Sequence, residues 1–138
     1  MGGIQMDYLQ QAKEFFKNEG YAIETTGIVI EQAEPQNAVC SLSVSDKHKN
    51  GVGVVMGGAI YTLADFAFAV AANVGQPLTV TLEGQITYLN PAKCQKLIAK
   101  TICEKAGSKI CIYRVLVTDE NGIDIASARF IGCRTSKK

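Results

Sequence analysis

The spacing of apolar and polar residues divides the chain into two helical segments and six segments with the character of β-strands. Residues 5–19 place apolar side chains near one helical face and end before Gly20, which predicts a helix with a stop. A second, very apolar helix is predicted for about residues 57–74, before a Gly-Gln-Pro stop. The strand candidates are rich in Val, Ile and Thr and cover residues 25–32, 37–45, 79–89, 96–104, 109–119 and 123–133.

The order of these elements predicts the fold class. Turn signals at 106–108 and 120–122 join the last three strands, and such short connections pair neighbouring strands antiparallel. Helix, two strands, helix and four strands then predict an α+β fold, with an antiparallel β-sheet wrapped around a central helix. The polar, Gly-containing segment 46–53 is expected to be a loop. We expect a single domain over residues 1–138, with an N-terminal helix at about 5–19.

The strand candidate at 109–119 carries apolar residues on both faces. One face has Ile110, Ile112 and Leu116, and the other has Cys111, Tyr113, Val115 and Val117. A sheet that covers one helix leaves its second face to water, and that face is normally polar. The pattern therefore predicts that another subunit covers the outer face, as in a homo-oligomer.

Composition is that of an ordered globular protein and argues against several classes of function. Apolar residues make up 47% and charged residues 20%, and the net charge is +1 without a dense basic block. Nucleic acid and anionic membranes are therefore not expected partners. The chain start lacks the pattern of a signal peptide, and the five cysteines form no CxxC pair, so we expect reduced thiols and a cytoplasmic location.

The apolar stretch 54–73 contains one charge, Asp65, which is also the only ionisable carboxylate or base in residues 51–74. A carboxylate in the middle of a membrane span costs about 2.5–3.5 kcal/mol, so a span is not expected. On a helical wheel the core stripe is Ile60, Leu63, Ala67, Val70 and Val74. The opposite side holds Asp65 with Gly58, Tyr61, Thr62, Phe68, Ala69 and Ala72. Because burying an unpaired carboxylate costs several kcal/mol, Asp65 faces water, bonds a buried hydroxyl or backbone group, or has a function.

Gly57 and Gly58 leave backbone N–H groups uncovered at the start of this helix. Such a site suits a phosphate, or an acyl oxygen that gains negative charge, although for a Gly pair alone a tight loop-to-helix connection is the better explanation. Asp65 follows Gly57 by eight residues, which is about 12 Å along a helix axis. One chain therefore cannot bring both groups to one carbonyl, but two antiparallel helices across a twofold axis can.

The motif N-G-x4-M-G-G-x4-L-A-D, from Asn50 to Asp65, resembles the signature of hot-dog-fold acyl-CoA thioesterases, in the phenylacetyl-CoA thioesterase-like branch. The similarity continues through ITYLNPAK (86–93), a turn near Gly107 and an ENG hairpin, and it covers about residues 22–134. It implies a hot-dog fold and hydrolysis of an acyl-CoA thioester. It also implies no metal or redox cofactor, with coenzyme A only as part of the substrate, and a homodimer that commonly pairs again into a homotetramer.

Carried over to this sequence, the resemblance implies four catalytic residues. Asp65 would be the catalytic carboxylate, acting as general base or as nucleophile, and the Gly57 N–H would polarise the thioester carbonyl. Asn50 would position water or the thioester, and Thr81 would assist near the carboxylate. Asn50 and Gly57 would come from one subunit, and Asp65 and Thr81 from its partner.

Met56 departs from this pattern, because the family usually has His before the Gly pair. Methionine fills the space but neither donates a strong hydrogen bond nor transfers a proton. A weakened hydrolase and a non-catalytic acyl-CoA or fatty-acyl binding module both fit this departure. A hydratase or dehydratase acting on enoyl thioesters is typically recognised by an Asp–His pair, and the only histidine, His48, is expected on the surface of the preceding loop. A general protein-interaction domain is the remaining alternative.

Two further groups are candidates for substrate contacts. Residues that would line the acyl site are Met56, Gly58, Tyr61 and Phe68, although side chains at such positions are often core residues. Coenzyme A carries several phosphate charges, so its site needs cations at the rim. By position in the sequence, the candidates are Lys93, Lys105 and Lys109.

Overall fold

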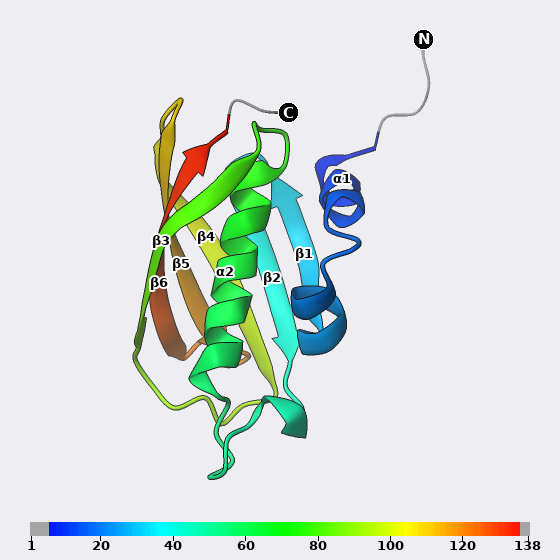
Figure 1. Cartoon of the computed structure of the whole chain (residues 1–138). Helices are drawn as coiled ribbons and strands as arrows, with labels where there is room; N and C mark the ends of the chain where they lie inside the picture. Colours follow the sequence, from blue (N-terminus) through cyan, green and yellow to red (C-terminus); the bar gives the residue numbers. More distant parts are fainter. Residues whose placement is uncertain (1–5, 136–138) are drawn as a thin grey trace.

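In the computed structural model, which describes residues 6–135, six strands form one antiparallel sheet that packs around helix α2 (Gly57–Asn73; Figure 1). The strands are β1 (Ile28–Glu34), β2 (Asn37–Ser43), β3 (Thr79–Tyr88), β4 (Lys96–Ala106), β5 (Ile110–Asp119) and β6 (Asp124–Arg134). Their order is β1-β2-β4-β5-β6-β3, and every neighbouring pair is antiparallel. The predicted α+β class, with a sheet around a central helix, is confirmed. Because α2 connects β2 to β3 at the far edge of the sheet, the connection crosses the sheet face.

Both ends of α2 lie within one residue of the prediction. At the C-terminal end Gly75 adopts a left-handed conformation with φ of 66°, which stops the helix. The Arg134 guanidinium donates hydrogen bonds to the Ala72 carbonyl (2.8 Å) and to Gln76 Oε1 (3.0 Å). A cation at this end complements the helix dipole, so β6 fixes the C-terminus of α2.

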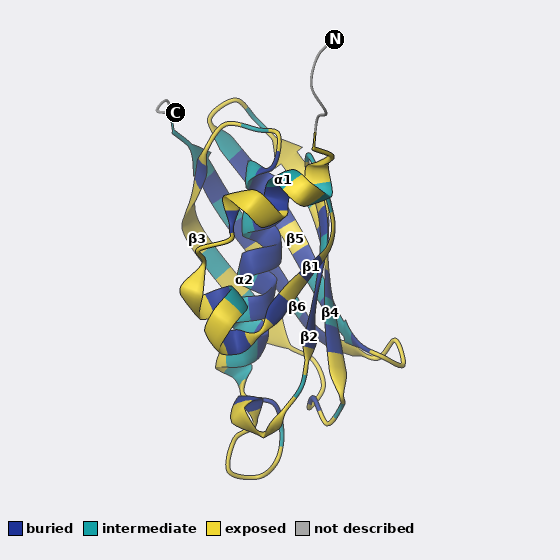
Figure 2. Cartoon of the chain, turned by 90° about the vertical axis from the view of Figure 1, so that its right-hand side faces the viewer, coloured by how far each residue is buried: buried dark blue, intermediate teal, exposed yellow. Residues whose placement is uncertain are grey.

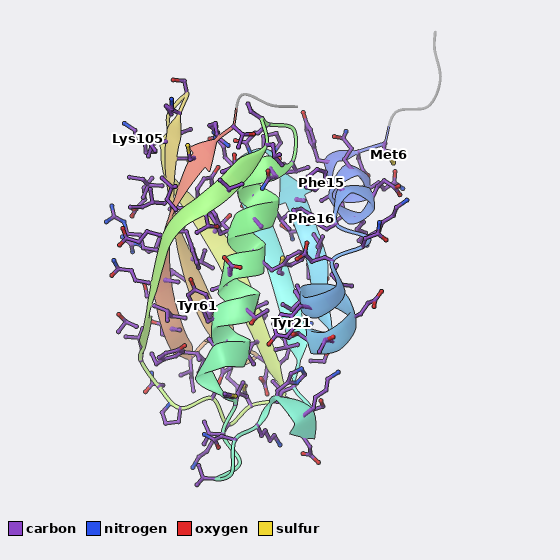
Figure 3. The ribbon with its side chains drawn as sticks, in the orientation of Figure 1. Met6, Phe15, Phe16, Tyr21, Tyr61 and Lys105 are labelled. Atoms are coloured by element: carbon purple, nitrogen blue, oxygen red, sulfur yellow. The ribbon has the colours of Figure 1, made fainter. Side chains whose placement is uncertain are left out.

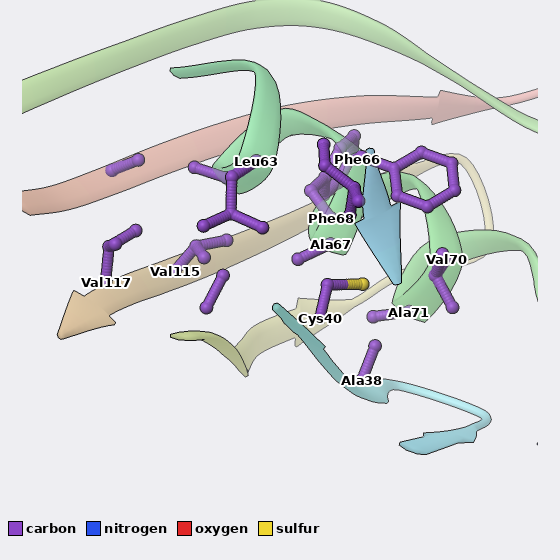
Figure 4. Packing of buried hydrophobic residues seen from close by; sticks show 14 of the residues in the cluster. Ala38, Cys40, Leu63, Phe66, Ala67, Phe68, Val70, Ala71, Val115 and Val117 are labelled. Atoms are coloured by element: carbon purple, nitrogen blue, oxygen red, sulfur yellow. The ribbon is translucent and has the colours of Figure 1, made fainter. Parts of the chain in front are cut away.

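The core-facing surface of α2 is wider than one stripe (Figure 4), and its buried residues are Ile60, Leu63, Ala64, Phe66, Ala67, Phe68, Val70, Ala71 and Ala72. Phe68 stacks on Phe130 of β6 with ring centroids 5.1 Å apart. It also lies over Gly132, where an added Cβ would come within 2.9 Å of the Phe68 ring. The expectation that Phe68 and Ala72 share the open side of α2 with Asp65 is therefore wrong. Both residues are in the core because a curved sheet encloses more of a helix than a flat one.

The N-terminal segment consists of α1 (Tyr8–Phe15) and a π-helical turn (Gly20–Thr26), which lie beside β1 (Figures 1 and 2). The Asp7 carboxylate caps α1 by accepting a hydrogen bond from the Gln10 N–H (2.8 Å). The predicted helix over 5–19 is thus shorter in the structure, and its residue 5 lies outside the described residues.

The strand predicted from residue 25 begins only at Ile28. The π-helical turn continues to Thr26, and Gly27 with φ of 90° ends it. Phe16, between the two helical pieces, packs against Phe66 of α2 with ring centroids 5.1 Å apart. The N-terminal segment therefore covers a second side of α2, which the sheet leaves open.

Strand β5 carries apolar residues on both faces, as predicted, and the outer face of the sheet also holds ion pairs of Glu104 with Arg114 (3.3 Å) and Arg129 (3.0 Å). Cys111, Tyr113, Val115 and Val117 are fully buried on the face toward α2. Ile112 and Leu116 are partly buried on the other face. A subunit that covers this outer face remains a prediction. No helix within residues 6–135 is long and apolar enough to cross a membrane.

Candidate active site

Asp65 lies on the one stripe of α2 that is not fully buried. Beyond the first turn, the partly exposed residues of the helix lie along one side and are Tyr61, Thr62, Asp65, Ala69 and Asn73. Within residues 6–135 the Asp65 carboxylate has no hydrogen bond and no ion pair. Burial, followed by the negative charge of Glu19, raises the pKa of this carboxyl above its usual value. The helix thus carries an unpaired, partly desolvated carboxylate with increased basicity.

The first turn of α2 offers free backbone donors. Met56 is the N-cap residue and makes no side-chain capping bond. In the part of the chain that the structure describes, the N–H groups of Gly57 and Gly58 have no acceptor, as is usual for the first turn of a helix. Tyr88 Oη donates a hydrogen bond to the Gly57 carbonyl (2.8 Å), and a Cβ on Gly57 would stand 3.0 Å from the Tyr88 ring. Gly57 is therefore held through its carbonyl while its N–H stays available.

A pocket of about 410 Å³ opens beside Gly57. Its apolar lining includes Val55, Ile60, Tyr88, Leu89, Pro91 and Ala92. The pocket joins the start of α2 to the end of β3 and the loop that follows, so an apolar group placed in it would lie next to the free N–H groups. Tyr88 is not recognisable as a site residue from sequence, because only the path of β3 along α2 brings it to Gly57.

Asn50 lies in the loop before α2 and is exposed. Its Oδ1 accepts hydrogen bonds from the N–H groups of Val52 (3.0 Å) and Val54 (3.1 Å). The carbonyl half of this side chain therefore holds the loop, and the Nδ2 amide is left to donate to water or to a bound carbonyl.

Thr81 lies on β3, which runs antiparallel to α2. At the C-terminal end of β3, Tyr88 contacts Gly57 at the start of α2. At the N-terminal end of β3, Thr79 Oγ1 donates a hydrogen bond to the carbonyl of Ala72, near the end of α2 (3.3 Å). Thr81 is exposed and lies along the second half of α2, toward the end at Ala72. Asn50 precedes the opposite end of the helix, so one chain holds these two residues apart.

The expected substrate contacts have different environments. Met56 is 58% exposed at the helix start, and Gly58 is exposed beside it. Tyr61 is partly buried on the side of α2 toward β3 (Figure 3), and its pKa is raised by burial and then by the charge of Asp65. Phe68 is a core residue and is left out of the candidate site.

The three lysines do not form one rim within a chain. Lys93 follows the pocket residues Pro91 and Ala92 at the N-terminal end of α2. Lys105 and Lys109 flank the β4–β5 hairpin at the opposite end of the molecule (Figure 3). Contacts of these lysines with coenzyme A therefore stay a prediction.

The free edge of β3 is apolar. β3 ends the strand order, so one of its edges has no strand partner. Exposed large apolar side chains along and beside it are Leu78, Val80, Leu82, Tyr88 and Leu89. Natural proteins normally protect such edges with charge, proline or a covering element. An apolar, unpaired edge next to both halves of the candidate site fits a surface that pairs with another chain.

Comparisons with known proteins give a consistent result. The family model described as "Thioesterase superfamily" matches residues 52–126. Mouse acyl-coenzyme A thioesterase 13 is 25% identical over 124 residues, which is 87% of this chain and 88% of the mouse protein. A Streptococcus mutans protein, smu.793, solved with acetyl-CoA bound, is 27% identical with a TM-score of 0.75, covering 80% of this chain and 90% of that one. Escherichia coli PaaI, from the phenylacetic acid degradation operon, has the same fold, with a TM-score of 0.87 at 23% identity over 95% and 96% of the two chains.

Proposed function

The chain belongs to the thioesterase superfamily, and from this premise we propose that it hydrolyses an acyl-CoA thioester to the free acid and coenzyme A. The observation that carries the proposal is the unpaired carboxylate of Asp65 on the open stripe of α2. The relatives support the substrate class, since one is an acyl-CoA thioesterase and another was solved with acetyl-CoA bound.

In the proposed reaction the Gly57 N–H donates a hydrogen bond to the thioester oxygen and stabilises the negative charge that develops there. Asp65 takes a proton from water as the water oxygen attacks the carbonyl carbon. The C–S bond then breaks, and the proton returns to the departing thiolate of coenzyme A. In the alternative course Asp65 attacks the carbonyl itself, the C–S bond breaks to release the coenzyme A thiolate, and water then hydrolyses the resulting anhydride. Asn50 Nδ2 orients the carbonyl or the water, and Thr81 assists beside the carboxylate.

The site is proposed to lie between two copies of the chain. Reacting groups must approach within about 3 Å, whereas Gly57 and Asp65 of one chain are about 12 Å apart along the helix axis. Pairing of the apolar β3 edges around a twofold axis would place two α2 helices side by side and antiparallel. Asn50 and Gly57 of one copy would then meet Asp65 and Thr81 of the other. The apolar residues Ile112 and Leu116 on the outer face of β5 support a second interface, and thus a dimer of dimers.

A non-catalytic acyl-CoA or fatty-acyl binding module is the second candidate, and Met56 is the observation that favours it. Release of free thiol from short, medium, long and aromatic acyl-CoAs separates the two. We expect at least one of these thioesters to be hydrolysed. Binding of acyl-CoA without release of thiol from any member of the panel would establish the binding module instead.

We expect Met56→His to increase kcat by about tenfold on the best thioester, because an imidazole at the helix start adds a hydrogen bond or a proton transfer. Met56→Leu, which keeps the size and adds no polar group, is the matched control and should leave kcat unchanged. Equal kcat values for the two variants would show that Met56 does not limit turnover.

A further inference from the structure

His48 is buried, and the expectation that it lies on the surface is wrong. Its exposed fraction is 6%, and it ends a short 3₁₀ turn (Asp46–His48) in the loop before α2. The imidazole reaches the N-terminal segment, where Nε2 is 2.7 Å from the Thr26 carbonyl oxygen. On the other side of the ring, the Ser45 N–H donates a hydrogen bond to Nδ1 (3.0 Å).

These two partners determine where the imidazole proton lies. A carbonyl oxygen can only accept, so Nε2 carries the hydrogen that it donates to Thr26. A backbone N–H can only donate, so Nδ1 must present its lone pair to Ser45. Ser45 Oγ also lies near Nδ1, but at 3.4 Å it is farther away than the Ser45 nitrogen at 3.0 Å. The two shorter contacts therefore favour the tautomer with its proton on Nε2.

The backbone of His48 also holds the start of α2. Its carbonyl accepts a hydrogen bond from the Met56 N–H (2.8 Å), and the Asn50 N–H donates to the Val54 carbonyl (2.8 Å). Lys49 and Val55 form an isolated bridge between these two bonds. Residues 48–56 thus form a loop whose two ends, His48 and Met56, are hydrogen-bonded to each other. Asn50 lies within this loop, and Gly57 follows its last residue.

We propose that His48 is a positioning residue. Its side chain ties this loop to Thr26 and thereby sets where the Asn50 amide and the Gly57 N–H stand. The expected effect of His48 on turnover rests on the proposed hydrolysis, whereas its expected effect on the position of the loop does not. Because displacements of about 1 Å at a reacting centre cost up to roughly 100-fold in rate, a loosened loop would reduce turnover without removing a reacting group.

The tautomer is tested by NMR on the full chain without added histidines. His48 is the only histidine in the sequence, so its ring signals need no assignment by mutation. A long-range ¹⁵N–¹H spectrum at neutral pH should show the proton on Nε2 and a lone pair on Nδ1. A proton on Nδ1 in the folded chain would overturn the proposal.

Three substitutions of His48 test its hydrogen bonds to Thr26 and Ser45 separately. His48→Gln can still donate to Thr26, His48→Asn can still accept from Ser45, and His48→Ala loses both bonds. Ser41→Ala is the matched control, because it removes a buried hydroxyl that donates to Glu31 (2.6 Å), on β2 and away from this loop. We expect His48→Ala to lower kcat by about tenfold or more, with a smaller change in KM, and His48→Gln to recover part of the loss.

The same variants give a readout that does not require hydrolysis. In His48→Ala, the amide signals of Gly57 and of the Asn50 side chain should shift, whereas in Ser41→Ala they should not. Unchanged signals in His48→Ala would refute the positioning role. Shifted signals in a chain that hydrolyses no acyl-CoA would refute the proposed function and leave the positioning role supported.

Discussion

Asp65→Asn should reduce kcat on the best acyl-CoA by about 100-fold or more, because an amide neither accepts a proton from water nor attacks a carbonyl. The amide has nearly the same shape as the carboxylate, so the protein should still fold and bind coenzyme A. Asp124→Asn is the matched control, since it makes the same chemical change at an exposed position on β6 and should leave kcat unchanged. Activity of Asp65→Asn equal to wild type would refute the proposed mechanism.

The pH dependence gives a second readout of the same residue. Asp65 acts in its ionised form, so kcat/KM should fall as the pH drops through its pKa. Because burial and the charge of Glu19 raise that pKa, the fall should begin at a higher pH than for an exposed aspartate, and Glu19→Gln should move it to lower pH.

The stability of the fold should change with pH in the direction opposite to that of kcat/KM. The folded chain holds the Asp65 proton more tightly than the unfolded chain, so the protonated form favours folding. This contribution is lost as the pH rises through the raised pKa. At neutral pH the charged Asp65 therefore opposes folding. The Tm of Asp65→Asn should then be equal to or higher than that of the wild type. A lower Tm for Asp65→Asn at neutral pH would show that the carboxylate has a stabilising partner.

Gly57→Pro should reduce kcat by about 100-fold, because it removes the N–H proposed to stabilise the thioester oxygen. Gly57 is the first residue of α2, a position that tolerates proline. Met56 has φ of −64° and ψ of 138°, which a following proline allows. The helix should therefore form without this donor.

Gly57→Ala is the matched control for this variant. It adds the same Cβ beside Tyr88 but keeps the N–H, and the exposed Tyr88 ring can move by a few tenths of an ångström. Alanine should therefore lose much less activity than proline. Equal losses in the two variants would mean that crowding at Tyr88, and not the N–H, explains the effect.

The strands and α2 could be predicted from sequence because their signals are local. Val, Ile and Thr runs with turn residues between them gave the six strands, and the Gly pair and the Gly-Gln-Pro stop bounded α2. The helical wheel placed Phe68 and Ala72 on the open side of α2, which is wrong because tertiary contacts bury both residues. A wheel with one core stripe assumes a flat covering surface, but the curved sheet also covers the side of α2 that carries Phe68.

The parts of the candidate site that could not be predicted depend on contacts distant in sequence. Tyr88 reaches Gly57 across 31 positions, and His48 reaches Thr26 across 22. A polar loop around a lone histidine gives no local sign that the ring is buried. Asp65 could be found from sequence alone because an isolated carboxylate in an apolar helix is unusual wherever its partners lie.

The central claim, that each site takes Gly57 from one subunit and Asp65 from the other, is tested most directly by a hybrid dimer. Asp65→Asn and Gly57→Pro chains carrying different tags are co-expressed, and the dimer with one chain of each kind is purified. Each parent homodimer should be nearly inactive. The hybrid has one site in which both groups are intact, so its kcat should be about half that of the wild-type dimer. A purified hybrid as inactive as its parents would contradict the shared site.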